Sequence, residues 1–585
     1  MAVSASQKVL LCLSLMGLLT GCGGGGGSSS GSGSSSSAPP LASITQAEAY
    51  RFLNQSTFGA TEASTQQLIA LGDPAYSRWI DQQVNLLTSN ASLNTVVAAF
   101  PDPVPTGFNR QTLHGNRVDY WFQSALSGSD QLRQRVAWAL SQIMVVSQVG
   151  ALQNLPFATA DYYDMLMRNA LGDYRILIEE VTLHPAMGVY LSMLGNQKAN
   201  PAANIRPDEN YARELMQLFT IGLVELNIDG TPRLDGSGQP IPTYNQAIIE
   251  GFARVFTGWK WACPTTAPNC TFANTRVQVD PVAGFNQVRP MQFYADQHET
   301  GTKQVLNYPG ATVTTIPANQ SGGQDLTMAL DNIFNHPNVG PFIGKQLIQK
   351  LVTSNPSPAY VQRVATVFNN DGTGRRGNLA AVVRAILLDS EARNAPGGAT
   401  AGKLKEPLLR ITQLWRAYGA TAASGRTNAA ANFGGGIAAP SSNYGQGPLQ
   451  SASVFNFFSP FYAPPGEISN QNLVAPELQL ATEFLNTTLT NFFWTQANNR
   501  STSQTQTNPD IMVINTQEEV GLAGDSEALI NRVARRLLGG TDQISATLKA
   551  QAKAQIERSA ATATATRVAD AIYLVASAPE YALQK

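Results

Sequence analysis

Four charged residues lie close together in one stretch of the chain: Asp208, Glu209, Arg213 and Glu214. On a helix, Glu209 and Arg213 share one face because they are four positions apart. A partly buried carboxylate pair can act as acid and base, because desolvation and repulsion separate the two pKa values. We therefore take all four as candidate catalytic residues. The alternative is a structural ion-pair network that pins the helix in place.

The sequence holds only four histidines, the side chain best suited to proton transfer near neutral pH. His298 lies in a segment with few helix signals, and we predict that it is a proton-transfer group or a metal ligand. Its neighbour Glu299 is a second, weaker metal-ligand candidate, so the cofactor that the sequence allows is a divalent metal. His184 and His336 each precede a proline and are expected to cap helix-end carbonyls. His114 is expected to be exposed in a turn.

Aromatic residues gather in a proline-rich segment that contains Phe457, Phe458 and Tyr462. An aromatic-rich loop is a candidate wall for binding a sugar or a peptide chain. Together with Trp259, these residues form our candidate binding wall, and core packing is the alternative. The sequence has no HExxH motif, no paired CxxC motif and no nucleophile elbow outside its Gly/Ser tract. These absences favour binding slightly over catalysis.

Helical spacing of apolar residues continues over most of the chain after Thr45. Thr45 and Glu48 have the spacing of a capping box, which predicts the start of the first helix. We expect the helices to position the charged cluster and the aromatic loop. Further helices are predicted over 130–146, 160–171, 174–183, 207–221, 246–257, 325–335, 340–352, 358–369, 378–390, 404–418, 474–498, 526–538 and 543–576.

The helical pattern breaks over 225–320, where turn residues and short alternating segments predict an irregular, partly β lobe. The Asp229–Gly230 pair is typical of a β-hairpin turn, and residues 275–279 alternate like a strand. Cys263 and Cys270 are predicted to form a disulfide that closes a proline-rich loop. The predicted fold class is therefore mainly α, a large multi-helix body with this insertion.

The folded part is expected to form one domain in two stretches, 42–419 and 447–585. Between them, residues 420–446 are rich in Gly, Ala, Ser and Asn, which predicts a flexible loop. Hydrophobic residues make up 43% of the chain, enough for a substantial core, whereas charged residues make up only 14% against the usual ~25%. With a net charge of −1 and no basic block, nucleic acid is excluded as a partner.

The amino terminus has the pattern of an export signal. After Lys8, the apolar run over 9–19 is too short to span a bilayer, which needs roughly 20 residues. It ends in Leu-Thr-Gly-Cys22, which resembles the lipobox of bacterial lipoproteins. We therefore predict a signal peptide over 1–21, lipidation of Cys22 and a Gly/Ser/Pro linker over 22–41. In a Gram-negative host, Gly23 rather than Asp after the lipidated cysteine favours the outer membrane, by resemblance to lipoprotein sorting rules.

The segment 206–222, RPDENYARELMQLFTIG, resembles the signature of the DUF1800 family of large exported bacterial proteins. The resemblance covers roughly 45–585. One departure is Trp138-Ala-Leu-Ser, where many relatives carry Trp-His-x-His, so no metal role is transferred to this position. Relatives are often encoded beside proteins that resemble alkaline phosphatases or sulfatases, which implies a partner of that kind. Other matching segments are 135–142, 184–188, 253–259, 298–303, 402–407, 453–460 and 576–581.

Two functions are consistent with this sequence. The first is a membrane-anchored envelope module that binds a surface polysaccharide or a partner protein without catalysis. The alternative is a hydrolase acting on an envelope or extracellular polymer, with the carboxylate cluster and His298 at its centre.

Overall fold

The computed structural model describes residues 44–86, 95–97, 100, 104, 107–265, 267–278, 285–394, 402–433, 439–499 and 508–585. The predicted signal peptide, Cys22 and the linker lie outside these residues, as does Val279 of the predicted 275–279 strand. All of the described residues belong to a single contact unit, Ser43–Lys585.

The prediction of a mainly α fold is confirmed. In the first half of the chain, the helices are α1 (Gln46–Ser56), α2 (Glu62–Ala70), α3 (Ala75–Asn85), α4 (Arg110–Ser127), α5 (Gln131–Ser141), α6 (Pro156–Asn169), α7 (Tyr174–Leu183), α8 (Pro185–Tyr190), η2 (Pro201–Ala203), α9 (Asn210–Gln217), α10 (Gln246–Val255) and η3 (Ala295–Gln297).

In the second half they are α11 (Gly322–Phe334), α12 (Val339–Leu351), α13 (Pro358–Asn369), α14 (Leu379–Leu388), α15 (Ser390–Arg393), α16 (Pro407–Ala417), α17 (Ala429–Phe433), α18 (Ala439–Tyr444), α19 (Glu467–Asn470), η4 (Pro476–Leu480), α20 (Glu483–Asn498), α21 (Gln517–Leu522), α22 (Ser526–Leu538), α23 (Ala546–Ile556), α24 (Thr564–Ser577) and α25 (Pro579–Ala582).

Local capping explains several helix boundaries. The Thr45 hydroxyl accepts from the Glu48 N–H at 3.2 Å, and the Glu48 carboxylate accepts from the Thr45 N–H at 2.8 Å, so the predicted capping box is confirmed. Ser357 caps α13 in a related way, by accepting from the Tyr360 N–H. The predicted bounds 174–183, 358–369 and 526–538 coincide with α7, α13 and α22.

Several segments differ from their predictions. The helix predicted over 474–498 is interrupted, since η4 ends at Leu480 and α20 begins at Glu483. The single helix predicted over 543–576 is two helices, α23 and α24, because the chain must turn back for the apolar residues of both to reach one core. The 420–446 segment, predicted to be a flexible loop, carries α17 and α18. Phe433 and Tyr444 are 3% and 5% exposed there, and both rings contact Phe492. Buried aromatic side chains therefore anchor a segment whose composition is typical of a loop.

The predicted lobe is irregular and contains short antiparallel pairs. β1 (Trp259–Lys260) pairs with β2 (Gln292–Phe293), and β3 (Lys303–Gln304) pairs with β4 (Thr315–Ile316). Isolated antiparallel bridges, such as Leu226–Pro232, confirm the hairpin around Asp229–Gly230. Residues 275–278 form no strand. A third pair joins β5 (Lys403–Leu404) to β6 (Leu583–Gln584).

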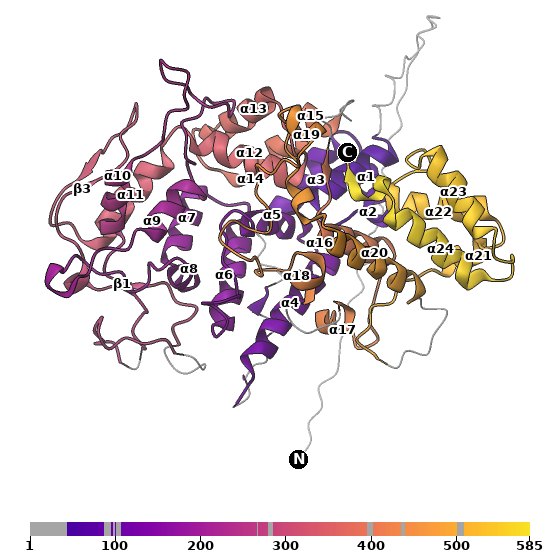
Figure 1. Cartoon of the computed structure of the whole chain (residues 1–585), viewed down its shortest axis with the longest axis horizontal. Coiled ribbons are helices and arrows are strands. Elements are labelled where there is room, and N and C mark those ends of the chain that lie inside the picture. The colour runs from indigo at the N-terminus through magenta and orange to yellow at the C-terminus, as the bar shows by residue number, and fades with distance from the viewer. Residues whose placement is uncertain are drawn as a thin grey trace, which may run out of the picture. The chain divides into compact units, whose positions relative to one another are not determined.

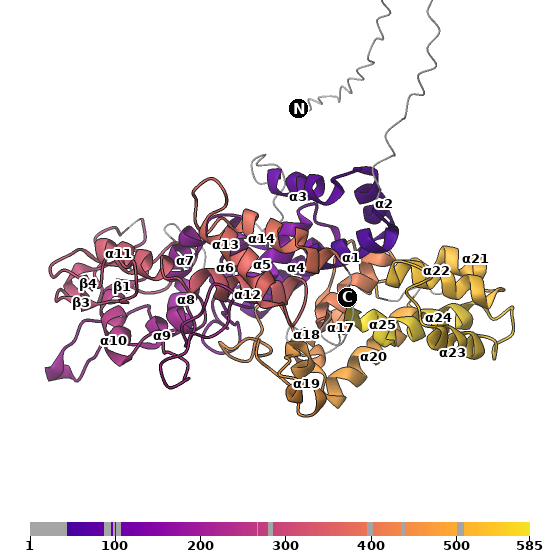
Figure 2. The same ribbon diagram turned by 90° about the horizontal axis from the view of Figure 1, so that it is seen from above.

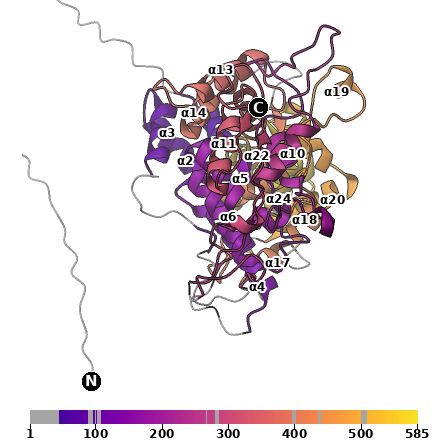
Figure 3. The ribbon, with the colours of Figure 1, turned by 90° about the vertical axis from the view of Figure 1, so that its left-hand side faces the viewer.

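One hydrophobic core runs through the unit, with Trp121, Trp138 and Trp415 almost completely buried. Helices α21–α24 pack together at one end of the unit, and α10, α11 and the β1–β4 segments lie at the other (Figure 1 and Figure 2). Helix α17 lies against α4 at the lower edge of the end-on view (Figure 3). Within the described residues, no helix is both long and apolar enough to cross a bilayer.

Candidate functional site

A cavity of about 610 Å³ lies between α12, the segment after α9 and the loop 454–461; we call it the first cavity. Its size falls in the range of ordinary ligand pockets. The lining is mostly apolar, and its only charged side chains belong to two lysines. The lining residues are Gln142, Ile143, Gln217, Leu218, Gly222, Leu223, Val224, Leu226, Gly230, Pro232, Phe342, Lys345, Gln346, Gln349, Lys350, Val454, Phe455, Asn456, Phe458, Ser459, Pro460 and Phe461.

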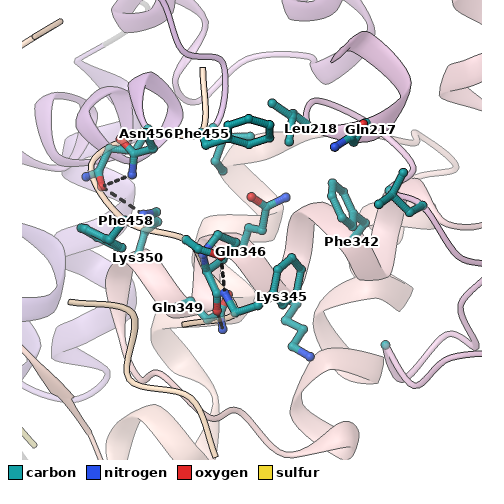
Figure 4. Close-up of a pocket in the computed structure, with 18 of the residues that line it drawn as sticks. Gln217, Leu218, Phe342, Lys345, Gln346, Gln349, Lys350, Phe455, Asn456 and Phe458 are labelled. Carbon is teal, nitrogen blue, oxygen red and sulfur yellow. Dashed lines mark hydrogen bonds between the residues drawn. The ribbon is translucent and has the colours of Figure 1, made fainter. Parts of the chain in front are cut away.

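Helix α12 supplies one wall of the first cavity (Figure 4). Phe342, Gln346 and Lys350 are spaced four residues apart, as are Lys345 and Gln349, so these side chains follow one face of the helix. The opposite face carries Ile343, Leu347 and Leu351, which are fully buried in the core. The polar face of an amphipathic helix, usually turned to bulk water, here faces a cavity.

Lys350 is a buried cation at this wall, with 4% of its surface exposed. Its ammonium group donates to Gln142 Oε1 at 3.0 Å and lies 4.0 Å from the centre of the Phe458 ring. Among the described residues, no carboxylate oxygen lies within ion-pair distance of Lys350 Nζ. Burial lowers the pKa of Lys350 to about 8 although Glu406 and Glu477 favour its charged form.

Behind Lys350, a fully buried network joins further charges. Lys403 Nζ lies 2.8 Å from Glu477 Oε1 and donates to the main-chain oxygen of Gln349 at 2.7 Å. Arg135 donates to the main-chain oxygen of Lys350 at 2.7 Å. Burial alone would raise the pKa of Glu406, but Lys403, Arg135 and Lys350 outweigh it and lower that pKa. Three cations therefore face two carboxylates, which leaves one positive charge without a counter-charge.

Amide side chains complete the polar part of the first cavity. Asn456 Nδ2 donates to Gln142 Oε1 at 3.2 Å, so Asn456 and Lys350 meet at one amide oxygen (Figure 4). Asn456 Oδ1 and Gln346 Nε2 are buried and have no hydrogen-bond partner among the described residues. A buried polar atom without a partner carries a desolvation cost, which a ligand group of matching polarity would remove.

The rim of the first cavity exposes large apolar side chains. Leu223, Phe455 and Phe461 are 56%, 57% and 64% exposed. Clustered exposed apolar side chains are typical of interaction sites, whereas scattered ones are ordinary. A second cavity of about 420 Å³ shares Lys345, Gln349, Pro460 and Phe461 with the first. The remainder of its lining is largely polar.

The predicted carboxylate cluster is mostly on the surface at the start of α9. Glu209 lies 3.1 Å from Arg213 and accepts from Gln246 Nε2, and the side chains of both ion-pair partners are more than 30% exposed. Asp208 is exposed, and its carboxylate accepts from the Asn210 N–H at 2.8 Å. Glu214 is buried, and burial raises its pKa. None of these four lines either cavity.

His298 and Glu299 lie apart from that cluster. His298 is 1% exposed, and its Nε2 lies 3.0 Å from Asp325 Oδ2, while Nδ1 lies 2.9 Å from the Thr257 main-chain oxygen. Lys303 Nζ also contacts Asp325 Oδ2, at 2.7 Å. Glu299 accepts from the Gly301 N–H at 3.3 Å. In the described part of the chain, no three His, Cys, Asp or Glu side chains are grouped as a metal site would require.

The other histidines are all buried. His184 and His336 accept from the N–H groups two residues ahead, at 3.1 Å, so they cap the following segments instead of the preceding carbonyls. The prediction that His114 is exposed in a turn is wrong. It lies within α4 and is 3% exposed, and this burial lowers its pKa to about 3. The helix that continues through the Gly-Asn pair carries its side chain into the core.

The residues of the candidate binding wall do not lie in one place. Phe458 lines the first cavity and is 2% exposed. Phe457 stacks on Trp138 with ring centroids 6.1 Å apart, and Trp259 packs against Phe293 across the β1–β2 pair. Neither these two nor Tyr462 lines the described cavities. Sequence reasoning missed Lys350 and Gln346, whose signal was the run of polar residues on one face of an otherwise core-forming helix.

The disulfide prediction is confirmed. Cys263 and Cys270 are bonded, with Cα atoms 5.6 Å apart. Together with Phe272 and Tyr294 they form a small apolar cluster, separate from the main core.

The family model described as protein of unknown function (DUF1800) matches residues 51–583, nearly the whole chain. The protein is a member of the DUF1800 family. Comparisons with curated proteins and with solved structures gave no match.

Proposed function

We propose that this protein is a binding module that captures a partner protein by an apolar segment inserted into the first cavity. The observation that carries the proposal is the apolar cavity of about 610 Å³ with Leu223, Phe455 and Phe461 exposed on its rim. A few side chains that are fully desolvated in a well-packed pocket contribute most of the energy of such contacts. A polysaccharide is a poorer fit, because it offers hydroxyl groups to a lining that is mostly apolar.

The proposed setting is the cell envelope. The signal-like run before Cys22 and the Gly/Ser linker after it support a lipid-anchored, exported chain, with the outer membrane as its expected place. A phosphatase- or sulfatase-like protein is a candidate partner. The anchor is tested by Cys22→Ser, which should move the expressed chain from the membrane fraction to the soluble fraction; retention of the variant in the membrane would exclude it.

The binding site is tested with the neutral fluorescent probe N-phenyl-1-naphthylamine and the full chain. Phe455→Ala combined with Phe461→Ala should weaken probe binding roughly tenfold, since contacts of this kind contribute on the order of 1–2 kcal/mol. Phe484→Ala is the matched control, because Phe484 is 60% exposed but lines neither cavity. Equal losses in the double variant and the control, or no probe binding to the unaltered chain, would refute the site.

The hydrolase alternative is supported by one observation, the burial of Glu214. Its pKa is raised, and its Oε2 has no hydrogen-bond partner among the described residues. A raised pKa at a buried carboxyl group is common in general acids. A hydrolase would lose turnover of a polymer substrate in Glu214→Gln at unchanged thermal stability, whereas a binding module would show no turnover in either form.

A further inference from the structure

The first cavity contains a buried cation that lacks a counter-charge. Lys350 is 4% exposed, and its ammonium contacts a neutral amide oxygen and an aromatic ring. The carboxylates of the network, Glu406 and Glu477, form no ion pair with Lys350 among the described residues. Glu477 pairs with Lys403 at 2.8 Å, and Glu406 accepts three side-chain hydrogen bonds at Oε2 while its Oε1 lies 3.9 Å from Lys403 Nζ. A buried charge is stable only when it is paired, so this position favours an anionic ligand group.

The positions beside Lys350 show which further groups the ligand would carry. Gln346 lies one turn before Lys350 on the same face of α12, and its Nε2 is a buried donor without a partner. Asn456 Oδ1 is a buried acceptor without a partner. A donor, an acceptor and an ammonium group in one apolar cavity match a ligand with a carboxylate, an N–H and an apolar side chain.

We propose that the first cavity binds the carboxyl terminus of a partner polypeptide whose last residue is apolar. Lys350 and Gln346 would hold the terminal carboxylate, Asn456 would accept from the last peptide N–H, and the side chain would fill the apolar part. This proposal rests on the proposed binding function and names the segment that binds. Five amide side chains line the cavity, Gln142, Gln217, Gln346, Gln349 and Asn456, and they favour a peptide over a plain acyl chain.

The test compares two peptides that differ only at their end. Gly-Ser-Gly-Ser-Phe, labelled with the same dye at its amino terminus, is prepared as the free acid and as the amide, and binding to the full chain is followed by fluorescence anisotropy. The free acid should bind at least tenfold more tightly than the amide. Equal binding of the two would overturn the carboxylate assignment, as would binding of neither. Probe binding with equal peptide affinities would leave the proposed binding function standing.

Lys350→Met should abolish the preference for the free acid, because Met keeps the length of the side chain without its charge. Lys198→Met is the matched control, since Lys198 is exposed and lines neither cavity, and it should keep the full preference. A preference that survives in Lys350→Met would assign the anion to another group. Dodecanoate serves as the competitor. If dodecanoate displaces the labelled peptide at a concentration equal to or lower than that needed of the unlabelled free acid, the ligand is an acyl chain and the polypeptide assignment is overturned.

A pH series on the unaltered chain keeps the proposal testable if Lys350→Met fails to fold. The charged groups around Lys350 are Arg135 from α5, Lys403 from β5, Glu406 from the start of α16 and Glu477 from η4. The pKa of Lys350 is lowered to about 8, so loss of its charge should make the preference for the free acid decline between pH 7 and pH 10. A preference that is constant over this range would overturn the role of Lys350.

Discussion

Two buried lysines, Lys303 and Lys350, are held in opposite ways. Lys303 is 0% exposed and lies 2.7 Å from Asp325, which also contacts His298. Its charge is balanced, and it lines neither described cavity. Lys350 is nearly as buried, but it contacts a neutral amide and lies in a cavity wall. Both the structural lysine and the cavity lysine are therefore buried charges. The cavity lysine differs because it has no counter-charge and lies beside a cavity.

The largest loss of stability is expected when the carboxylate that balances Lys303 is removed. Asp325→Asn leaves the Lys303 ammonium buried without a carboxylate, and unfolding by denaturant should show a loss of about 3–5 kcal/mol. Asp331→Asn on the same helix is the matched control, because its ion pair with Arg175 leaves the Asp331 side chain 53% exposed. The control should change stability by less than about 1 kcal/mol. A small loss in Asp325→Asn would show that Lys303 is neutral or balanced elsewhere.

An intermediate effect is expected from the titration of Lys350. Its folded-state pKa of about 8 lies below the unfolded value of 10.5, so between these values the unfolded chain holds a proton that the folded chain lacks. Stability therefore increases with pH in this window, by up to about 1.4 kcal/mol per unit. Denaturant unfolding of the unaltered chain and of Lys350→Met between pH 8 and pH 9.5 should diverge by roughly 1–2 kcal/mol. Parallel pH profiles of the free energy of unfolding in the two proteins would contradict the assignment of Lys350 as a cation without a counter-charge.

The smallest effect concerns a charge pair at the surface. Glu209→Gln removes the ion pair with Arg213, whose side chain is 41% exposed, and stability should change by less than about 1 kcal/mol. Peptide and probe binding should be unchanged, because Glu209 lines neither cavity. A loss of several kcal/mol, measured by the same unfolding experiment, would mean that this pair is structural in the way that Asp325 and Lys303 are.

Most of the helices could be predicted because their signals are local. The capping box at Thr45 and the apolar spacing of α13 are each short-range patterns within one helix. Each was sufficient to predict its helix. The break between α23 and α24 was not predictable in this way, since it depends on where the second helix packs. The same limit applies to residues 420–446, where burial of Phe433 and Tyr444 against α20 outweighs a loop-like composition.

The site was less accessible to sequence reasoning than the helices. The sequence marks His298 as a candidate, but its partner Asp325 comes from α11 and also pairs with Lys303 of β3, and no local spacing predicts that Asp325 reaches His298. Phe458 was found through the aromatic, proline-rich loop that now lines the first cavity. Lys350 was missed because a polar helix face normally indicates solvent, whereas here the 454–461 loop and the segment after α9 enclose it as a cavity wall.

The pairing of β5 with β6 has a consequence for the order in which the protein can be completed. Gln584 Nε2 donates to the main-chain oxygens of Leu351 and Val352, which end α12, and Gln584 follows Leu351 by 233 positions. These carbonyls meet that partner only after residue 584 has been synthesised. During synthesis, which runs from the amino to the carboxyl end, the helix that forms the cavity wall lacks this partner until nearly all of the family domain has been made. The carboxyl end of this wall is thus completed late in synthesis, well after every residue that lines the first cavity has been made.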